Sequence, residues 1–291
     1  MKILSTLLVA ALAVTSLHAA PKKLLVVTTT TGFRHSSIPT LEKELTQLSK
    51  DSGAFTVDFV QQPPGEPAQR RGATPEERQA YADARMKFLE AMTNELQKLA
   101  PENLKNYDGV VFASTTGDLP IPDPQGLLDW IKAGHAFIGI HAASDTFHHW
   151  PGYIDMLGGE FDHHGAQLSV ECLNEDPQNP ATASLGKTWT LTQEEVYQFK
   201  NYDPAKVHEL LILDKKPQAP FTPGHYPVSW CKSYGDGKVF YTSLGHREDI
   251  IDPDPNLPHR VNSVEISKAY DAHILGGIEW ALGLKTSGSV Q

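Results

Sequence analysis

Residues 24–32 read LLVVTTTTG, an apolar and β-branched run that ends at a glycine. Such a run is typical of a strand buried on both faces of a parallel sheet, because neither face meets solvent. A helical pattern follows, with apolar side chains at positions 38, 41, 45 and 48. Residues 55–60 then predict a second strand. The mature chain therefore starts with a strand, a helix and a strand, the order typical of an α/β sheet.

The alternation continues through the first half of the chain. Further strands are predicted over residues 107–113 and 136–141, and helices from Thr74 to about residue 99 and over 125–133. Threonine before proline is a favourable helix start, since threonine caps the first turn and proline suits its first position. A loop rich in proline, glycine and arginine, predicted to be exposed, covers residues 63–75.

The second half is dominated by short strands. They are predicted over residues 166–173, 188–191, 210–214, 228–233 and 239–243, with a closing helix over 273–282. No internal repeat or linker separates the halves. We therefore predict one doubly wound α/β domain over residues 21–291, with additional strands in its C-terminal half.

Composition excludes several classes of protein. The 291 residues are 40% hydrophobic and 21% charged, which is too apolar for a disordered chain. Two cysteines cannot form a disulfide-rich scaffold. A net charge of -10 argues against nucleic acid or an anionic membrane surface as partner. The unusual count is 13 histidines, because histidine is a common metal ligand.

The N-terminus has the pattern of a secretory signal. Lys2 precedes an apolar run over residues 3–17, and two alanines follow at 19 and 20. We predict a signal peptide over residues 1–20 and an exported, periplasmic or extracellular protein; an uncleaved N-terminal anchor is the alternative. No other stretch is long and apolar enough for a membrane span. Export would permit a disulfide between Cys172 and Cys231, and two free buried thiols are the alternative.

Polar clusters follow four predicted strands. They lie at residues 32–35 (GFRH), 114–118 (STTGD), 141–145 (HAASD) and 245–249 (GHRED). Because open α/β sheets bind ligands at the carboxyl ends of their strands, we expect these clusters to converge on one pocket.

Histidines are densest between residues 141 and 164, where five of them accompany Asp145, Glu160 and Asp162. Nitrogen and oxygen donors in this mixture suit Zn²⁺ or Mn²⁺. No HExxH spacing occurs. The candidate metal ligands are His35, His141, His163 and His246, with His164 as the alternative to His163.

Two further motifs carry chemistry. Residues 139–143 (GIHAA) have the form of a nucleophile elbow, but His141 takes the central position and Ala143 replaces the closing glycine. Acyl transfer by a thiol or hydroxyl is therefore disfavoured at this turn. The motif EEVY at residues 194–197 could direct a carboxylate and a phenol into the pocket; a solvated acidic pair is the alternative.

Eight short sequence motifs between residues 23 and 284 occur in the same order as in one known protein family. They are GFRH (32–35), GIHA (139–142), WPGY (150–153), LGGEF (157–161), EEVY (194–197), PVSW (227–230), VFYTSLGH (239–246) and GGIEWA (276–281). In these motifs the chain resembles the trehalose-utilisation (ThuA-like) family of the class I glutamine amidotransferase-like superfamily. The resemblance implies a flavodoxin-like three-layer α/β/α sandwich.

The resemblance also carries expectations about activity. His141 stands where glutamine amidotransferases have the catalytic cysteine, so amidotransferase activity is not expected. The family implies handling of sugars, particularly disaccharides or glycosides oxidised at C3 by a partner sugar 3-dehydrogenase. Some members bind a divalent metal. The alternative to such a hydrolase or lyase is a non-catalytic sugar-binding or accessory protein.

A mechanism on a 3-keto sugar needs a base, an electrophile and an acid. We expect His141 or Glu195 to be the base and Asp145 to orient His141. The carbonyl would be polarised by a bound metal or by a histidine. The residues assigned to that step and to substrate binding are His35, His246, Arg34, Phe33, Trp150, Tyr197 and Asp118. The non-catalytic alternative would instead use Phe33, Trp150, Tyr197 and Trp230 to stack on sugar rings.

Overall fold

We describe the protein from a computed structural model, in which residues 20–288 are described. Its N-terminal half contains β1 (Lys22–Val27), α1 (Ile38–Ser52), β2 (Phe55–Val60), α2 (Pro75–Leu96), η1 (Gln97–Leu99), α3 (Pro101–Leu104), β3 (Gly109–Ala113), α4 (Pro124–Lys132), β4 (Ala136–Ile140), η2 (His141–Asp145) and α5 (Pro151–Leu157). Its C-terminal half contains β5 (Glu160–His164), β6 (Leu168–Asn174), β7 (Thr188–Glu194), β8 (Tyr197–Lys200), η3 (Pro204–Lys206), β9 (His208–Lys215), β10 (Pro223–Tyr234), β11 (Gly237–Thr242), α6 (Glu248–Ile251) and α7 (Val264–Ala281). The predicted signal peptide lies almost wholly outside the described residues.

Nine strands form one sheet in the order β2-β1-β3-β4-β11-β10-β9-β6-β7. Strands β2, β1, β3, β4 and β11 pair in parallel, which is the flavodoxin-like order. Strands β10, β9, β6 and β7 extend the sheet with antiparallel pairs. The predicted flavodoxin-like fold with additional C-terminal strands is confirmed.

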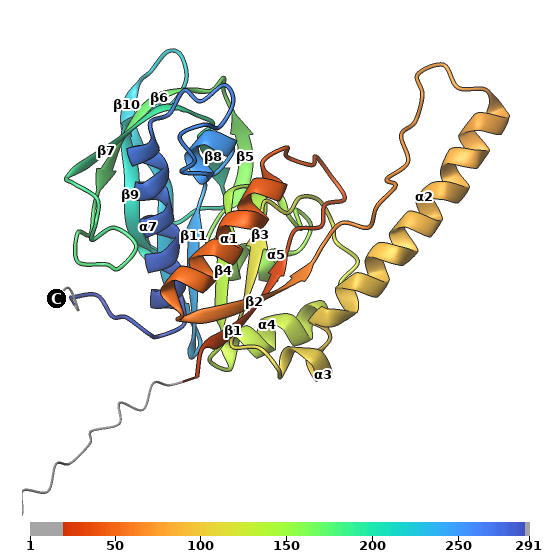
Figure 1. The fold of residues 1–291 in the computed structure, drawn as a ribbon, viewed down its shortest axis with the longest axis horizontal. Helices are drawn as coiled ribbons and strands as arrows, with labels where there is room; N and C mark the ends of the chain where they lie inside the picture. The colour runs from red at the N-terminus through yellow and green to blue at the C-terminus, as the bar shows by residue number, and fades with distance from the viewer. Residues whose placement is uncertain (1–19, 289–291) are drawn as a thin grey trace, which may run out of the picture.

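Helices cover both faces of the parallel part of the sheet (Figure 1). Alternate residues of β1 enter different cores, because successive side chains of a strand point to opposite faces. Leu24 and Val26 belong to the cluster that includes residues of α1 and α7. Leu25 and Val27 belong to the cluster that includes residues of α2, α4 and α5. The result is a three-layer α/β/α sandwich.

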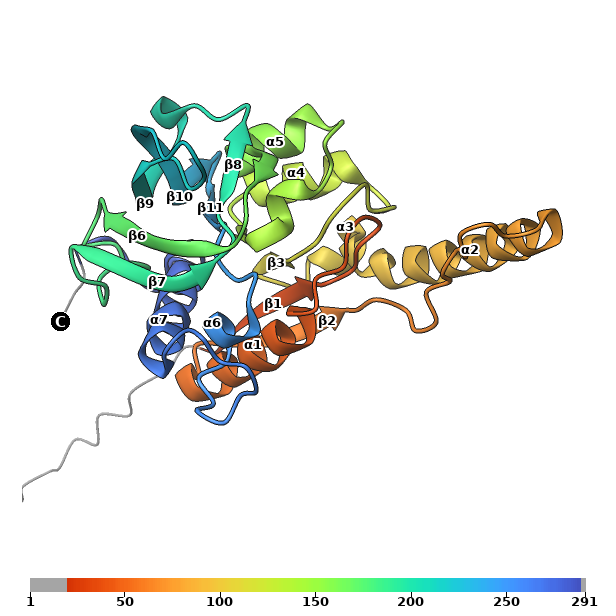
Figure 2. The ribbon, with the colours of Figure 1, turned by 90° about the horizontal axis from the view of Figure 1, so that it is seen from above.

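Helix α2 has an N-terminal capping box. The Glu77 amide donates to the Thr74 hydroxyl at 3.2 Å, and the Thr74 amide donates to the Glu77 carboxylate at 2.8 Å. Its first turns extend away from the rest of the molecule (Figure 2). Buried side chains occur only toward its end, at Phe88, Met92 and Leu96. The loop of residues 63–75 is largely exposed, as predicted.

Several elements differ from the sequence prediction. Helix α7 begins at Val264, nine residues before the predicted start. A separate two-stranded sheet, β5 with β8, was not predicted. Strand β5 (EFDHH) is largely polar and lacks an apolar alternation, and β8 (YQFK) alternates over only four residues, too few for a clear strand signal.

The two cysteines are free, buried thiols. Cys172 lies on β6 and Cys231 on β10, and β9 runs between these two strands. Strands two places apart in a sheet are about 9.5 Å apart, which exceeds the roughly 7 Å limit for the Cα atoms of a disulfide. The disulfide alternative is therefore wrong, and the free-thiol alternative is correct.

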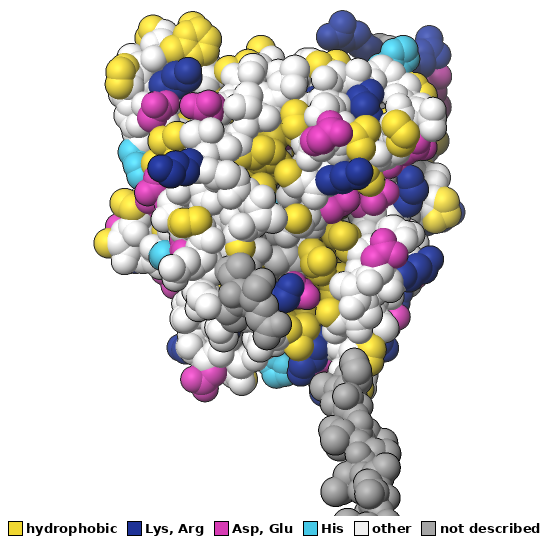
Figure 3. All heavy atoms as spheres, turned by 60° about the vertical axis from the view of Figure 1, so that its left-hand side comes forward, with side chains coloured by type: hydrophobic (Ala, Val, Ile, Leu, Met, Phe, Trp, Pro, Cys, Tyr) yellow, Lys and Arg dark blue, Asp and Glu magenta, His cyan; other side chains and the backbone are white. Residues whose placement is uncertain are grey.

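On the face shown in Figure 3, basic and acidic side chains are interspersed rather than segregated. Within residues 20–288, none of the helices is long and apolar enough to cross a bilayer.

The segment between β11 and α7 is held by one buried carboxylate. Asp249 accepts hydrogen bonds from the Arg247 guanidinium at 2.8 Å and from the backbone amides of Val261 and Asn262 at 2.6 and 2.9 Å. Burial alone would raise the pKa of Asp249, but these donors outweigh it and lower the pKa to about 2. This carboxylate therefore fixes both ends of the loop that follows His246.

Replacing Asp249 by asparagine should lower the free energy of unfolding by about 2–3 kcal/mol, since buried donors lose a charged acceptor. Because the pKa of Asp249 is lowered from 3.8 to about 2 by folding, its contribution should be complete above pH 3.8 and disappear as pH falls through about 2. Urea denaturation measures both effects. Asp214→Asn, at an exposed position of β9, is the control, and an equal loss in both variants would contradict the prediction.

Candidate functional site

Four side chains from four separate segments form one group, which we call the His/Glu cluster: His35, His141, Glu195 and His246. One ligand atom of each lies within 4.8 Å of the others. His35 follows β1, His141 follows β4, His246 follows β11, and Glu195 lies between β7 and β8. Because β1, β4 and β11 are parallel, their carboxyl ends meet at one edge of the sheet, where a ligand site is expected. Histidines from three of the four strand-end clusters therefore converge on one place, as predicted.

His141 is the best fixed member of the cluster. It is fully buried and has the left-handed backbone conformation, with φ of 50°, which is uncommon for a residue other than glycine and clusters at functional sites. Its Nδ1–H donates to the Ser243 carbonyl oxygen at 2.7 Å. The lone pair is therefore on Nε2, which accepts from the Tyr197 hydroxyl at 3.0 Å. A bond from Nδ1–H to a backbone carbonyl is how proteins orient a metal-binding histidine, and a metal at Nε2 would take the place of the Tyr197 hydroxyl.

The three imidazoles pack against one another. Ring centroids are 4.7 Å apart for His35 and His141, and 5.4 Å apart for His246 and each of the other two. Burial, followed by the neighbouring His246, lowers the pKa of His35 to about 4. Burial and the two neighbouring histidines hold the pKa of His141 well below its usual range. Both rings are consequently neutral at pH 7, the form that binds metals.

Glu195 connects the cluster to two histidines. One carboxylate oxygen lies 3.3 Å from Nδ1 of His246 and the other 3.1 Å from Nδ1 of His164. Burial opposes a charge on His246, but the Glu195 carboxylate outweighs it, so the pKa of His246 is raised. Glu195 is only 6% exposed, which shows that the alternative of a solvated acidic pair at residues 194 and 195 is wrong.

The carboxylate of Glu194, next to Glu195 in sequence, binds backbone amides and does not belong to the cluster. Glu194 is completely buried and accepts from the backbone amides of Gly245 and His246 at 3.0 and 2.8 Å. Burial raises the pKa of Glu194 to about 8. Gly245 has a φ of 115°, and a Cβ there would lie 2.5 Å from the Tyr270 hydroxyl. Glu194 and Gly245 together set the turn that places His246, a role that the sequence analysis missed.

The cluster fits a divalent cation. Three imidazoles and one carboxylate are a donor set for Zn²⁺ or Mn²⁺. Tetrahedral Zn²⁺ places its ligand atoms about 3.4 Å apart, so ligand atoms that now lie up to 4.8 Å apart would have to move closer by up to about 1.4 Å. The Nδ1 atom of His35 is buried without a hydrogen-bond partner, and that of His246 has the Glu195 carboxylate at 3.3 Å; buried polar atoms normally have a partner. A cation would satisfy the buried His35 nitrogen that the protein leaves unsatisfied.

A hydrogen-bonded group of titratable side chains lies beside the cluster. His148 lies between two carboxylates, 2.7 Å from Asp145 and 2.7 Å from Glu160. Glu160 also accepts from Asn201 at 2.6 Å and lies 3.1 Å from the Lys200 ammonium. Asp145 was expected to orient His141, but it bonds to His148, and Ser243 holds the His141 ring instead. Asp145 still interacts electrostatically with His164 and Tyr197, both of which contact the cluster.

His163 does not join the cluster. It is exposed, and its Nε2 lies 2.9 Å from the Gln198 amide and 3.0 Å from the Gln218 amide. His164 contacts Glu195 instead, because neighbouring residues of a strand point to opposite faces. The open choice between these two histidines is settled in favour of His164 as the neighbour of the site.

The other expected substrate contacts are dispersed. Phe33 is 68% exposed and packs edge-on against His35, at 4.8 Å between ring centroids. Tyr197 is buried in the cluster itself. The Arg34 guanidinium donates to the carbonyl oxygen of Thr28 at 2.8 Å. Trp150 packs on Phe147 and Tyr153, Trp230 is fully buried in the core, and Asp118 is exposed and does not belong to the cluster.

Comparison with known proteins identifies the family. Residues 23–281 match the ThuA family, which is described as trehalose utilisation. The chain belongs to the ThuA family. No curated protein is significantly similar to it in sequence.

Two solved structures share the fold. A ThuA-like protein from Parabacteroides merdae is 18% identical with a TM-score of 0.65, over 93% of each chain. A ThuA-like protein from Bacteroides uniformis is also 18% identical with a TM-score of 0.60, over 95% of this chain and 98% of that one. The family description connects this chain to sugar utilisation.

The ThuA chain should bind one divalent cation at the His/Glu cluster. Removing one ligand, in His35→Ala, should weaken affinity by more than the roughly 10–100-fold that outer contacts supply. Zn²⁺ titration of the metal-stripped protein, followed by calorimetry, measures this. His163→Ala is the matched control and should keep full affinity. Loss in His163→Ala, or none in His35→Ala, would contradict the assignment.

Cation affinity should also fall as the solution becomes more acidic. Ligands must be deprotonated to bind, and His246 is the imidazole of the cluster whose pKa is raised. The decline should therefore begin near the raised pKa of His246, above 6.5, and continue at lower pH. The same titration at a series of pH values checks the sign, and affinity that is constant between pH 8 and 5 would exclude His246 as a ligand.

Proposed function

We propose that this ThuA protein is an exported enzyme that processes sugars by metal-assisted acid–base chemistry. The observation that carries the proposal is the His/Glu cluster at the carboxyl ends of three parallel strands. Its substrates would be disaccharides or glycosides oxidised at C3, cleaved or isomerised after a sugar 3-dehydrogenase has formed the keto group. Zn²⁺ or Mn²⁺ would be the cofactor.

A keto group at C3 makes the hydrogen at C2 acidic. A base must remove that proton while the oxygen at C3 takes up negative charge. A cation held by His35, His141, Glu195 and His246 would supply the electrophile for that oxygen. These four side chains then serve as ligands, so their lone pairs are not available for proton transfer. We therefore propose neither His141 nor Glu195 as the base, which differs from the expectation from sequence.

Asp145 is the better candidate for the base. Its side chain is 27% exposed, and burial raises its pKa, which brings a carboxylate closer to the proton affinity that a base needs. His148 bonds to Asp145 at 2.7 Å and is itself held by Glu160 at 2.7 Å. In the proposed step the C2–H bond breaks and its proton passes to Asp145. The C1–O bond then breaks, a C1=C2 double bond forms, and the leaving oxygen takes the proton from Asp145.

The alternative of a non-catalytic sugar-binding protein has less support. It relied on four aromatic side chains stacking on sugar rings. Trp230 is completely buried, Trp150 packs on Tyr153, and Tyr197 is bonded to His141. Phe33 alone of the four is largely exposed. One exposed aromatic ring beside a buried set of metal-type ligands favours chemistry over simple binding.

Asp145→Asn should lower kcat for a 3-keto glycoside by about 100-fold or more. The cation content should be unchanged, because Asp145 is outside the His/Glu cluster. Release of the aglycone measures the rate, and elemental analysis measures the cation. Asp162→Asn is the matched control, since Asp162 forms an Asp–His pair of 2.7 Å with His163 on the exposed strand β5.

Two outcomes would contradict different parts of the proposal. Wild-type turnover by Asp145→Asn would exclude Asp145 as the base. A wild-type protein that binds the cation but turns over neither 3-keto disaccharides nor 3-keto glycosides would exclude the substrate class.

A further inference from the structure

A cavity of about 400 Å³ opens beside strand β6, outside the His/Glu cluster. Its walls include Leu168, Val170, Leu213, Pro217 and Phe221. Val170 and Leu213 are buried, whereas Phe221 is 53% exposed and is one of the few large apolar side chains on the described surface. An exposed aromatic side chain at the mouth of an apolar cavity is typical of a ligand site.

The cavity exists because two strands separate. Strands β6 and β9 pair only at Leu173–Ile212 and Asn174–Leu211. Between these pairs and the far ends of the two strands, at Leu168 on β6 and Lys215 on β9, the strands do not pair further. Residues of the segment 216–221, which follows β9, line the resulting opening. The backbone therefore builds this opening into the sheet.

The cavity lies at the same end of the sheet as the cluster. Leu168, which lines the cavity, pairs with Glu194 on β7. Glu194 holds the backbone of His246, and the next residue, Glu195, belongs to the cluster. On the other side Gly165, next to His164, lies against Gln218 in the segment that closes the cavity. The short segment from His164 to Leu168 is thus shared by both sites.

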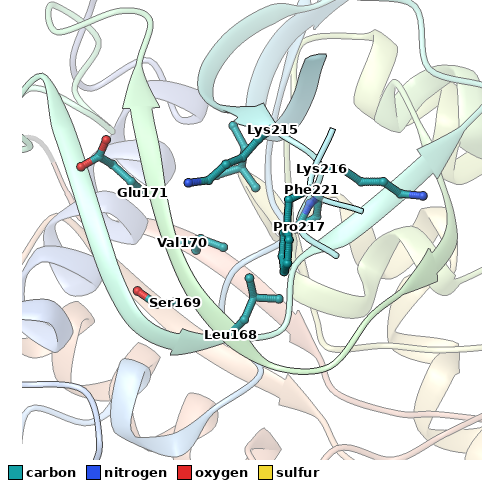
Figure 4. A pocket seen from close by; sticks show the side chains of 9 residues that line it. Leu168, Ser169, Val170, Glu171, Lys215, Lys216, Pro217 and Phe221 are labelled. Carbon is teal, nitrogen blue, oxygen red and sulfur yellow. The ribbon is translucent and has the colours of Figure 1, made fainter. Parts of the chain in front are cut away.

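The largely apolar walls of the cavity favour an apolar ring over a second sugar ring. In Figure 4 the Phe221 ring and the Leu168 side chain point toward one another, while the polar ends of Ser169 and Glu171 point away from them. A second sugar ring would leave most of its hydroxyl groups without partners on such walls, and unpaired polar groups are costly. A flat apolar ring would bury its faces against leucine, valine and phenylalanine. The volume is enough for one or two fused rings.

We propose that this cavity binds the aromatic aglycone of a glycoside whose sugar ring lies at the His/Glu cluster. The inference rests on the proposed function, which it narrows to glycosides with an apolar, aromatic leaving group. Lys215, at the rim, is available for a phenolic oxygen on that group. Phe221 would stack on the ring and Leu168 would contact its opposite side.

The test uses 4-methylumbelliferone, a fluorescent two-ring phenol, and the full chain. Saturable binding with one site per chain is expected from fluorescence anisotropy. Phe221→Ala should weaken it by roughly tenfold, because an aromatic contact and its buried area are lost. Leu168→Phe, which fills the cavity, should weaken it as well. Met86→Ala is the matched control, since Met86 is 63% exposed on the distant helix α2.

Failure to bind the probe, or equal binding by the wild type, Phe221→Ala and Leu168→Phe, would overturn the proposal. A second arm compares KM for 3-keto forms of methyl and 4-methylumbelliferyl glucoside. The aryl compound should have the lower KM in the wild type, and Phe221→Ala should remove that preference while leaving the methyl compound unchanged. An equal KM for both compounds would overturn the aglycone assignment. Absence of turnover with retained probe binding would instead contradict the proposed function and leave the cavity as a site for aromatic ligands.

Discussion

Parallel pairing of β1, β3, β4 and β11 is the constraint on which the site depends. Parallel strands in register end at the same edge of the sheet. The pairing of the strands therefore brings the residues that follow them together, and the chain does not need contacts among those residues in order to fold. His35, His141 and His246 come from segments more than 100 residues apart, yet their rings touch. Hydrophobic burial of the strands, which is large and non-directional, supplies the free energy that brings three weakly basic side chains together.

That assembly has an electrostatic cost. Each imidazole opposes the protonation of its neighbours, and burial adds to the effect, so the pKa values of His35 and His141 are low. Glu195 offsets part of the cost for His246 only. The backbone also carries strain, since His141 and Ser114 both have positive φ at the ends of β4 and β3. Hydrogen bonds to His141 from Tyr197 and Tyr241, and from its own ring to Ser243, keep this conformation in place.

Much of this arrangement could be predicted from sequence, for identifiable reasons. Continuous apolar runs bounded by glycine are typical of buried parallel strands, so β3 and β4 were placed within two residues, whereas β1 ends at Val27, four residues before the end of the predicted run. The strand-end histidines followed from that placement. The fourth ligand could not be chosen, because the choice between His163 and His164, and the turn of Glu195 toward His246, depend on the face to which each side chain points. A shift of one residue in strand register exchanges those faces. Strand β5 (EFDHH) lacks the apolar alternation that would reveal its register, and the alternation of β8 (YQFK) covers only four residues.

Burial also explains which aromatic residues were misassigned. Trp230 occurs in the motif PVSW within β10, and its indole nitrogen donates to the Leu157 carbonyl oxygen at 2.8 Å inside the core. A tryptophan whose single donor is satisfied by backbone has no polar group left to offer a ligand. Phe221 is the opposite case. It lies in an irregular proline-rich segment with no motif around it, and it is 53% exposed at the cavity between β6 and β9. Local sequence indicates the propensity of a segment to form a helix, a strand or a turn. The place where two strands separate depends on the whole sheet. A subsite formed at such a place can therefore be recognised only from the assembled structure.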